Sequence, residues 1–295
     1  MTDRRFARFA VGVLVFNVGV ILFGAVVRAT GSGAGCGSHW PTCGGDVVPL
    51  SGSAERFIEF GHRASSGIAL VLVAILVIWA VRTRRPGDSV RIATIVSGVL
   101  IVNEALIGAA LVLFEWVGDD RSAGRAVSIT VHLVNTFLLL AALTLTAWWA
   151  SGRPVPPRRP QRTTAWLVGI GAGALILVGA TGAITALGDT LFPPHEVGVD
   201  HSGSFLVSLR WVHPVLAVGT GLYLLHLARV LPVPDRMRGY LAAIVVTQLM
   251  AGVVNIALAA PVWMQVVHLL IADVVWIGLV VIGSTALSDR AEVMA

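Results

Sequence analysis

Charged side chains are scarce in this sequence. Only 13% of its 295 residues are charged, whereas 56% are hydrophobic and the mean hydropathy is +0.84. Soluble domains carry about 25% charged residues, so the composition excludes an ordinary soluble protein. It indicates a polytopic α-helical membrane protein.

Lysine is absent, and all 21 basic residues are arginine. The net charge of +5 would suit nucleic acid if the arginines lined one face of a domain. Instead they flank apolar segments, which is the pattern that orients a protein in a membrane. We therefore expect the lipid bilayer, and no nucleic acid, as a partner.

Eight apolar segments have close to the ~20 residues that a helix needs to cross a bilayer. They cover residues 10–28, 62–82, 91–113, 127–150, 164–187, 206–229, 239–260 and 263–287. Fifteen arginines lie on the side of the N-terminus and six on the opposite side. Because positive residues mark the cytoplasmic side, the sequence predicts an all-α integral protein of the plasma membrane with eight transmembrane helices. Both termini are expected in the cytoplasm.

Cysteine is also rare, and both residues, Cys36 and Cys43, lie in the longest outer loop, at about 29–61. This loop faces an oxidising compartment, so a disulfide between them is expected, with two free thiols as the alternative. His39 lies between them, but one histidine and two cysteines in a glycine-rich loop are weak grounds for a zinc site.

A proline-rich stretch divides the chain into two halves that resemble each other. We expect an N-terminal half at 1–152, a cytoplasmic linker at 153–163 and a C-terminal half at 164–295. An even number of helices in each half gives a parallel repeat with its axis along the membrane normal. The predicted architecture is therefore two pseudo-symmetric four-helix bundles. The landmarks that recur are residues 24–31 and 182–188, Glu104 and Gln248, and Gly108 and Gly252.

Four of the eight histidines stand near the outer ends of the second, fourth, sixth and eighth segments. They are His62, His132, His213 and His268. Each half contributes two, and two histidines that face each other across a four-helix bundle are a common way to bind a haem iron. A single membrane histidine is more often a helix contact, and His226, which has no counterpart in the first half, is interpreted in that way. The remaining histidines, His39, His195 and His201, lie in outer loops.

Glu59 precedes His62 by three residues, so the two share a helix face and a carboxylate is expected beside whatever His62 binds. No acid stands three residues before His213, which predicts a reaction site in the first half and a site of ligands alone in the second. The alternative role for Glu59 is a favourable charge at a helix N-terminus. Glu104, in the middle of a segment, is expected to be protonated, paired or facing the first site.

Three outer arginines, Arg28, Arg63 and Arg210, are candidates for pairing with haem propionates. Plain anchoring at the membrane interface is the equally weighted alternative.

The run at residues 24–33, the cysteines around Trp40-Pro41, and the sequence Glu59-x-x-His62-Arg63 resemble haem A synthase, and the resemblance extends over all eight segments. It implies successive hydroxylation of a methyl group of haem O to a formyl group, which gives haem A for terminal oxidases. Glutamine is expected more often than glutamate at the position of Glu104.

The resemblance also implies roles for individual residues. His213 and His268 would bind a haem b cofactor through its iron, His62 and His132 would face the haem O substrate, and Glu59 would be the essential acid. The site would lie toward the extracytoplasmic side. The expected partners are an electron acceptor and the farnesyltransferase that produces haem O.

Two other functions compete with this one. A bis-histidine haem b protein that transfers electrons would need the four histidines but gives Glu59 no role. A proton-coupled transporter would use Glu104 and Asp273 as proton carriers, but it makes no use of four histidines at one depth.

Overall fold

The computed structural model describes residues 2–192 and 209–288, which are helical apart from their connecting loops. The helices are α1 (Thr2–Ala29), α2 (Ala54–Thr83), α3 (Ser89–Leu113), α4 (Ala123–Ala150), α5 (Arg162–Leu191), α7 (Val212–Val230), α8 (Asp235–Ala257) and α9 (Val262–Ser288). Two short 3₁₀ helices, η1 (Ser32–Ala34) and η2 (Leu209–Trp211), join them. The all-α class predicted from the sequence is confirmed.

Seven of these helices are long and apolar enough to cross a membrane, which indicates a multi-pass membrane protein. The helix outside this group is α7, which has 19 residues and begins at Val212, later than the predicted 206. Residues 206–208 lie outside the described ranges. Pro214 stands in the first turn of α7, where a missing N–H group is tolerated.

The second helix begins earlier than predicted, at Ala54 instead of 62. Its first two turns carry charged residues, so an apolar criterion misses them. The N-terminus is nevertheless well defined, because the Ser53 hydroxyl accepts a hydrogen bond from the Arg56 N–H at 3.5 Å, as an N-cap residue does. The outer loop therefore ends before Ala54, and Glu59 lies within α2.

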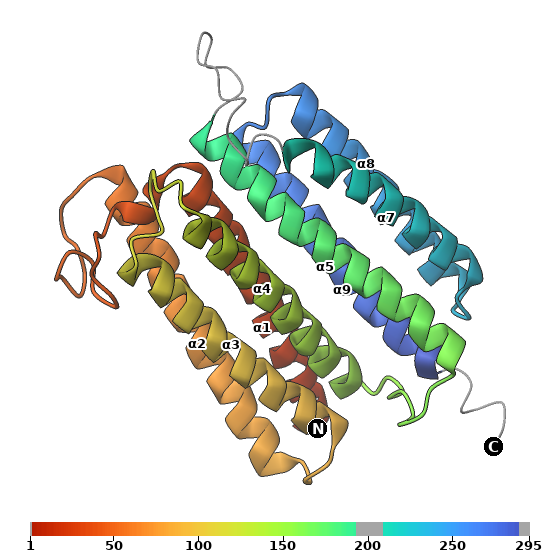
Figure 1. Ribbon diagram of the computed structural model, residues 1–295. Coiled ribbons are helices and arrows are strands. Elements are labelled where there is room, and N and C mark those ends of the chain that lie inside the picture. The colour runs from red at the N-terminus through yellow and green to blue at the C-terminus, as the bar shows by residue number, and fades with distance from the viewer. Residues whose placement is uncertain (1, 193–208, 289–295) are drawn as a thin grey trace.

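The helices run alongside one another, with α1 to α4 on one side and α5, α7, α8 and α9 on the other (Figure 1). Contacts between the two sides come from α1, α4, α5 and α9. At their centre, Phe137 of α4 stacks on Trp276 of α9 with ring centroids 5.2 Å apart. The Trp276 indole N–H donates to the Phe137 carbonyl at 2.7 Å, so a buried polar group is satisfied across the interface.

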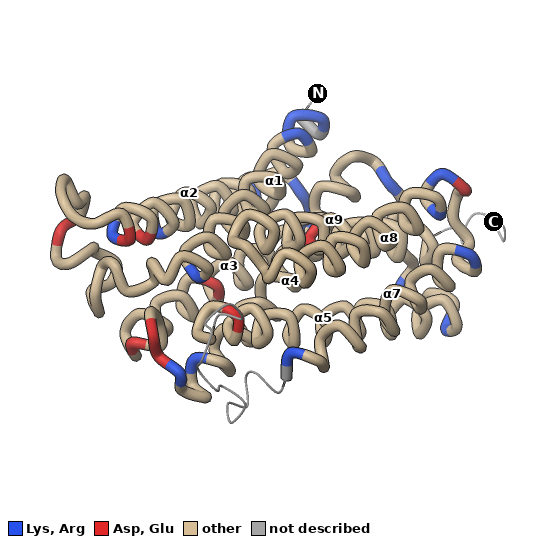
Figure 2. Tube along the Cα trace, turned by 90° about the horizontal axis from the view of Figure 1, so that it is seen from above, with Lys and Arg blue, Asp and Glu red and all other residues tan. Residues whose placement is uncertain are grey.

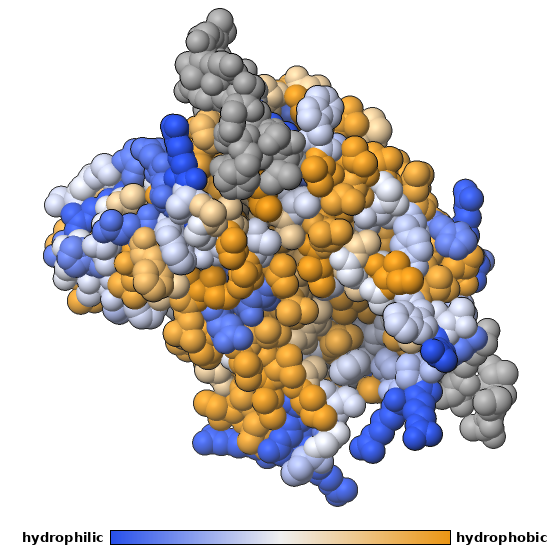
Figure 3. Space-filling model, viewed as in Figure 1, coloured by the Kyte–Doolittle hydropathy of each residue, from blue (hydrophilic) through white to orange (hydrophobic). Residues whose placement is uncertain are grey.

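The surface agrees with a membrane environment. Charged residues gather mostly in loops and near helix ends, while long stretches of helix carry none (Figure 2). Apolar side chains cover the middle of the face in Figure 3, and hydrophilic ones lie toward its ends. Outward-facing residues such as Leu106 and Leu222 are 60% and 61% exposed, which in a membrane places them against lipid.

Candidate functional site

Two pairs of imidazoles lie within the helical assembly, one in each half. His62 of α2 and His132 of α4 are close enough to interact electrostatically. His213 of α7 and His268 of α9 form the second such pair. The four histidines singled out in the sequence are thus brought together two by two. His226 belongs to neither pair, and its ring lies 6.5 Å from that of Tyr223.

Glycines give these imidazoles the room that they occupy. A Cβ atom at Gly24 of α1 would lie 3.0 Å from Cε1 of His62, and one at Gly182 of α5 would lie 2.9 Å from Cε1 of His213. Real Cβ atoms rarely approach so closely, so each ring rests against a helix backbone that only glycine can offer. The same contact therefore recurs at matching positions of the two halves.

Replacing Gly182 by alanine should displace His213 and so weaken the binding of a haem held between His213 and His268. Overpacking of a tight site costs about 1–3 kcal/mol, which corresponds to roughly 5–150-fold in affinity. Haem content per protein, measured from the pyridine haemochrome spectrum, reports the loss. Gly173→Ala on the same helix is the control, because an added Cβ there meets nothing within 4 Å. Equal haem content in the two variants would contradict the role of Gly182.

The second nitrogen of each imidazole shows whether the pairs suit a haem iron. Nδ1 of His213 lies 3.1 Å from the Val178 carbonyl oxygen, and Nδ1 of His132 lies 3.4 Å from a Glu104 carboxylate oxygen. Nδ1 of His62, of His132 and of His268 is buried without a hydrogen-bond partner among the described residues. The amide nitrogen of Gln248 lies 3.3 Å from Nε2 of His268. Metal-binding histidines are commonly held through the nitrogen that does not bind the metal, and among the four His213 has a hydrogen-bond contact of this kind at Nδ1. The chemistry of the donor set, two imidazoles in each half, suits a haem with two imidazole ligands at each pair.

Glu59 and Arg63 form a buried ion pair on the outer turns of α2. The Glu59 side chain is 4% exposed, and one carboxylate oxygen accepts hydrogen bonds from Arg63 Nη2 at 2.5 Å and Nε at 3.1 Å. Its other oxygen accepts from the Cys36 backbone N–H at 2.7 Å. Arg63 Nη1 donates to the carbonyls of His39 and Thr42 at 2.6 and 2.8 Å. The pair thus holds the outer loop through both partners.

The outer loop is seated on the start of α2. The disulfide between Cys36 and Cys43 is formed, as the sequence predicted. Gly35 packs backbone to backbone on the helix, because a Cβ there would lie 2.5 Å from the Glu55 carbonyl carbon. Arg56 Nη2 donates to the Cys43 carbonyl at 2.9 Å. This docking brings the Cys36 N–H onto Glu59.

The other two arginines proposed for propionates also bind protein groups. Arg28 of α1 reaches α5 and α9, where it donates to the Ala186 carbonyl at 2.7 Å and to the Gln265 side chain at 2.9 Å. Arg210 lies 2.9 Å from the Asp189 carboxylate and donates to the Phe192 carbonyl at 2.5 Å.

Asp189 and Gln265 were missed in the sequence. The second half has an acid beside its outer arginine after all, but that acid comes from α5 and does not stand three residues before His213. The signal that could have found Asp189 is an acid within a predicted helix, where charge is expensive unless it is paired.

Glu104 of α3 is paired, which is one of the three states that the sequence predicted for it. Its carboxylate accepts hydrogen bonds from Asn135 Nδ2 at 2.5 Å and from the Thr136 hydroxyl, and it also faces His132. Asp273 of α9 differs, because it is fully buried and neither carboxylate oxygen has a partner within the described ranges. His195 and His201 lie outside those ranges.

The fold and the site together define a multi-pass helical membrane protein with two interior imidazole pairs. The chain belongs to the family of cytochrome oxidase assembly proteins (COX15-CtaA), whose sequence model matches residues 7–280. The resemblance noted in the sequence points to the same family.

Individual relatives carry two different names. Over 98% of its length the chain is 47% identical to a protein of Thermus thermophilus named "Protoheme IX farnesyltransferase", and the match covers 49% of that protein. It is 30% identical to the "Heme A synthase" of Shouchella clausii, over 74% of this chain and 67% of the relative. It is 38% identical to the "Heme A synthase" of Alkalihalophilus pseudofirmus over 46% of this chain. The chain thus spans about half the length of the Thermus relatives that it matches.

Proposed function

We propose that this chain oxidises a porphyrin methyl group of haem O to a formyl group, through successive hydroxylations, and so produces haem A for terminal oxidases. The observation that carries the proposal is that each half contains two neighbouring imidazoles. Only the first of these two pairs lies next to the turn of α2 that carries Glu59. The relatives named "Heme A synthase" support it.

The two pairs have different roles in this proposal. His62 and His132 bind the substrate haem O, and His213 and His268 are the axial ligands of a haem b cofactor. When bound, haem b supplies one-electron redox chemistry. Glu59 is the acid of the substrate site, where a carboxylate can stabilise positive charge that develops on the porphyrin or accept a proton from adding water. Arg28, Arg63 and Arg210 surround the outer ends of the sites and can meet propionates beyond their present partners.

The membrane arrangement is part of the proposal. All eight helices cross the plasma membrane, α7 included, as two pseudo-symmetric bundles at 1–152 and 164–295 joined by a linker at 153–163. Both termini are cytoplasmic, because fifteen of the arginines then lie on the inner side. Both imidazole pairs are consequently nearer to the extracytoplasmic side.

A haem-farnesylating protein is the proposed source of haem O, and an unidentified electron acceptor takes the electrons. The supporting observation is the Thermus relative, in which a segment similar to this chain makes up about half of a longer protein named a farnesyltransferase. In such a longer chain, a part similar to haem A synthase is covalently joined to the rest of a protein named a farnesyltransferase. This arrangement suits direct transfer of a poorly soluble haem from one part to the other.

Pigment analysis tests the proposed function. The protein is expressed in cells that make haem O but no haem A, and haems are extracted and separated by chromatography. We expect haem A to accumulate with this chain, and none to form with His132→Ala. Bound haem b without haem A would favour an electron-transfer protein, and a sample without any haem would favour a transporter. Formation of haem O from protohaem and farnesyl diphosphate would assign the relative's printed activity to this chain instead.

A further inference from the structure

A groove follows the seam between α3 and α4 and is open to the surroundings of the helices. It holds a cavity of about 310 Å³, which falls in the range of roughly 300–1,000 Å³ that is typical of small-ligand sites. Its apolar lining is partly exposed, with Leu106 at 60% and Val131 at 49%, so in a membrane it meets lipid. The apolar residues of this α3–α4 groove are Leu106 and Ile107 of α3 and Val131, Val134 and Leu138 of α4.

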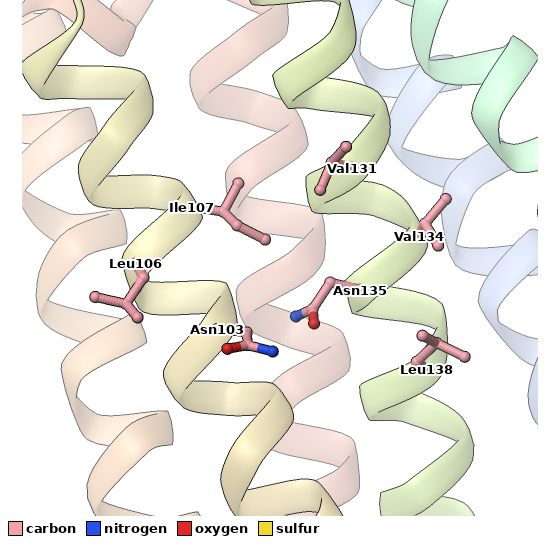
Figure 4. A pocket seen from close by; sticks show the side chains of 7 residues that line it. All are labelled: Asn103, Leu106, Ile107, Val131, Val134, Asn135 and Leu138. Atoms are coloured by element: carbon pink, nitrogen blue, oxygen red, sulfur yellow. The ribbon is translucent and has the colours of Figure 1, made fainter.

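Two amides reach into the α3–α4 groove from opposite helices (Figure 4). Asn103 lies near the middle of α3, is exposed, and makes no hydrogen bond to any described residue. Asn135 of α4 is 8% exposed, and its Nδ2 donates to the Leu100 carbonyl and to Glu104, while its Oδ1 accepts no hydrogen bond within the described ranges. An amide without a partner is costly in hydrocarbon. The groove therefore suits an occupant that is largely apolar but carries a polar group.

A short chain of contacts joins the groove to the first imidazole pair. Asn135 Nδ2 lies 2.5 Å from one oxygen of the Glu104 carboxylate, and the other oxygen lies 3.4 Å from Nδ1 of His132. Val131, which lines the groove, is the residue before His132. The groove and the imidazole thus occupy the same level of α4. A macrocycle bound at the His62–His132 pair would have the seam between α3 and α4 beside it.

The second half does not repeat the two amides. Counted from the matched landmarks of the two halves, Asn103 corresponds to Thr247 and Asn135 corresponds to Ile271. The Thr247 hydroxyl donates to the Ala243 carbonyl of its own helix at 2.9 Å, and isoleucine has no polar side-chain atom. The amides are therefore a feature of the half that is proposed to bind the substrate.

We propose that the α3–α4 groove binds the farnesyl chain of haem O, and that the amides of Asn103 and Asn135 form hydrogen bonds with the hydroxyl group at the root of that chain. The inference rests on the proposed function, because haem O has to bind at the His62–His132 pair. It deepens that function by naming the residues that distinguish the substrate from the cofactor.

The chemistry of the two haems matches the difference between the two halves. Haem O differs from haem b in one substituent, because a hydroxyethylfarnesyl group replaces a vinyl group. The chain is apolar and its hydroxyl group is polar, which are the two properties of the groove. Since lipid is as apolar as the chain, selectivity has to come from close packing and from hydrogen bonds. The apolar lining provides the first, and the amides provide the second.

Haem affinities test the proposal without the reaction. Purified protein that carries its resident haem is titrated with haem O or with haem b, and binding is followed by difference absorption spectra. Wild-type protein should prefer haem O. Ile107→Trp fills the groove and should weaken haem O binding by roughly 5–150-fold, as overpacking does, without an effect on added haem b. Asn103→Leu should weaken haem O binding about fivefold, which is the contribution of one neutral hydrogen bond.

Two matched variants show whether the position matters. Ile92→Trp introduces the same bulk on the same helix, at a residue that is 52% exposed and lines neither this groove nor the neighbouring cavity. It should leave both affinities unchanged. Val99→Trp fills the neighbouring cavity, which lies between α2 and α3, measures about 480 Å³ and also includes Asn103. Loss of haem O affinity in Val99→Trp but not in Ile107→Trp would overturn the proposal, because the chain would then occupy that cavity.

The remaining outcomes separate this inference from the proposed function. If wild-type protein binds no added haem O, or if His62→Ala binds it equally well, the proposed function fails. If haem O binds through His62 but Ile107→Trp and Asn103→Leu keep the wild-type ratio of the two affinities, the groove is occupied by lipid, and the inference is overturned while the function stands. If Ile107→Trp weakens both haems equally, the imidazole site itself is damaged, and Asn103→Leu, which adds little bulk, decides the question.

Discussion

Glu59→Gln should stop haem A formation while haem b stays bound. General acid–base groups contribute about 100- to 10,000-fold to a rate, so we expect at least about 100-fold less haem A per unit of protein. Glutamine keeps an acceptor oxygen for the Cys36 N–H, and Arg63 keeps the carbonyls of His39 and Thr42. The loop should therefore stay docked, and the measurement is haem A and haem b content by chromatography of extracted pigments.

Two further variants separate chemistry from loop docking. Arg63→Gln breaks the same buried ion pair and also removes the bonds to the His39 and Thr42 carbonyls, but leaves the carboxylate in place. A purely structural role therefore predicts at least as large a loss from Arg63→Gln as from Glu59→Gln. A catalytic role predicts a much larger loss from Glu59→Gln. Glu55→Gln, at an exposed position in the first turn of α2, should have no effect. Haem A formation by Glu59→Gln at the wild-type level would refute the assignment.

Much of the fold follows from the sequence because a bilayer restricts the choices. Backbone groups in lipid must be satisfied within a helix, so apolar runs of the right length predict the spans. The predicted and observed ends of the third helix agree at 113, and those of the fourth agree at 150. Hydropathy does not reveal the part of a helix that extends beyond its apolar run. The capped polar turns at Ala54 are the clearest case, since their stability comes from Ser53 and the loop and not from hydropathy.

The pairing of the four histidines was also predictable, for a different reason. Duplication places equivalent residues in equivalent surroundings, so His62 and His213 could be matched by their order along the chain alone. The structure adds that each of these two rings rests on a glycine in the first helix of its own half: His62 on Gly24 of α1, and His213 on Gly182 of α5. One sequence was enough because the landmarks recur in the same order, and no single landmark would have carried the inference.

The partners of the outer charges were not predictable. Arg28 meets Ala186 and Gln265, which lie 158 and 237 residues further along the chain. Local periodicity specifies which face of a helix a residue occupies, but not which helix lies opposite. The same limit hid the Asp189–Arg210 pair. Glu59 shows the limit within one helix, because its side chain joins the loop through Cys36 although its spacing places it on the face of His62.

His213→Ala should remove haem b and leave haem O binding at the first pair. Loss of a residue that merely supports a metal ligand costs about 10–100-fold in metal affinity, so loss of the ligand itself should cost more than about 100-fold. His62→Ala should do the opposite, with haem b retained and haem A formation lost. The difference follows from the two separate pairs, His62 with His132 and His213 with His268. Pyridine haemochrome spectra of the purified variants measure the haem b content.

The matched control is His226→Ala, because this histidine lies on the same helix as His213 but belongs to neither pair. It should keep haem b and activity near wild-type levels. Equal haem b content in His213→Ala and His226→Ala would remove His213 from the cofactor site. Loss of haem b from both His62→Ala and His213→Ala would mean that the two halves share one haem instead of binding two. The division into a substrate site and a cofactor site would then be wrong.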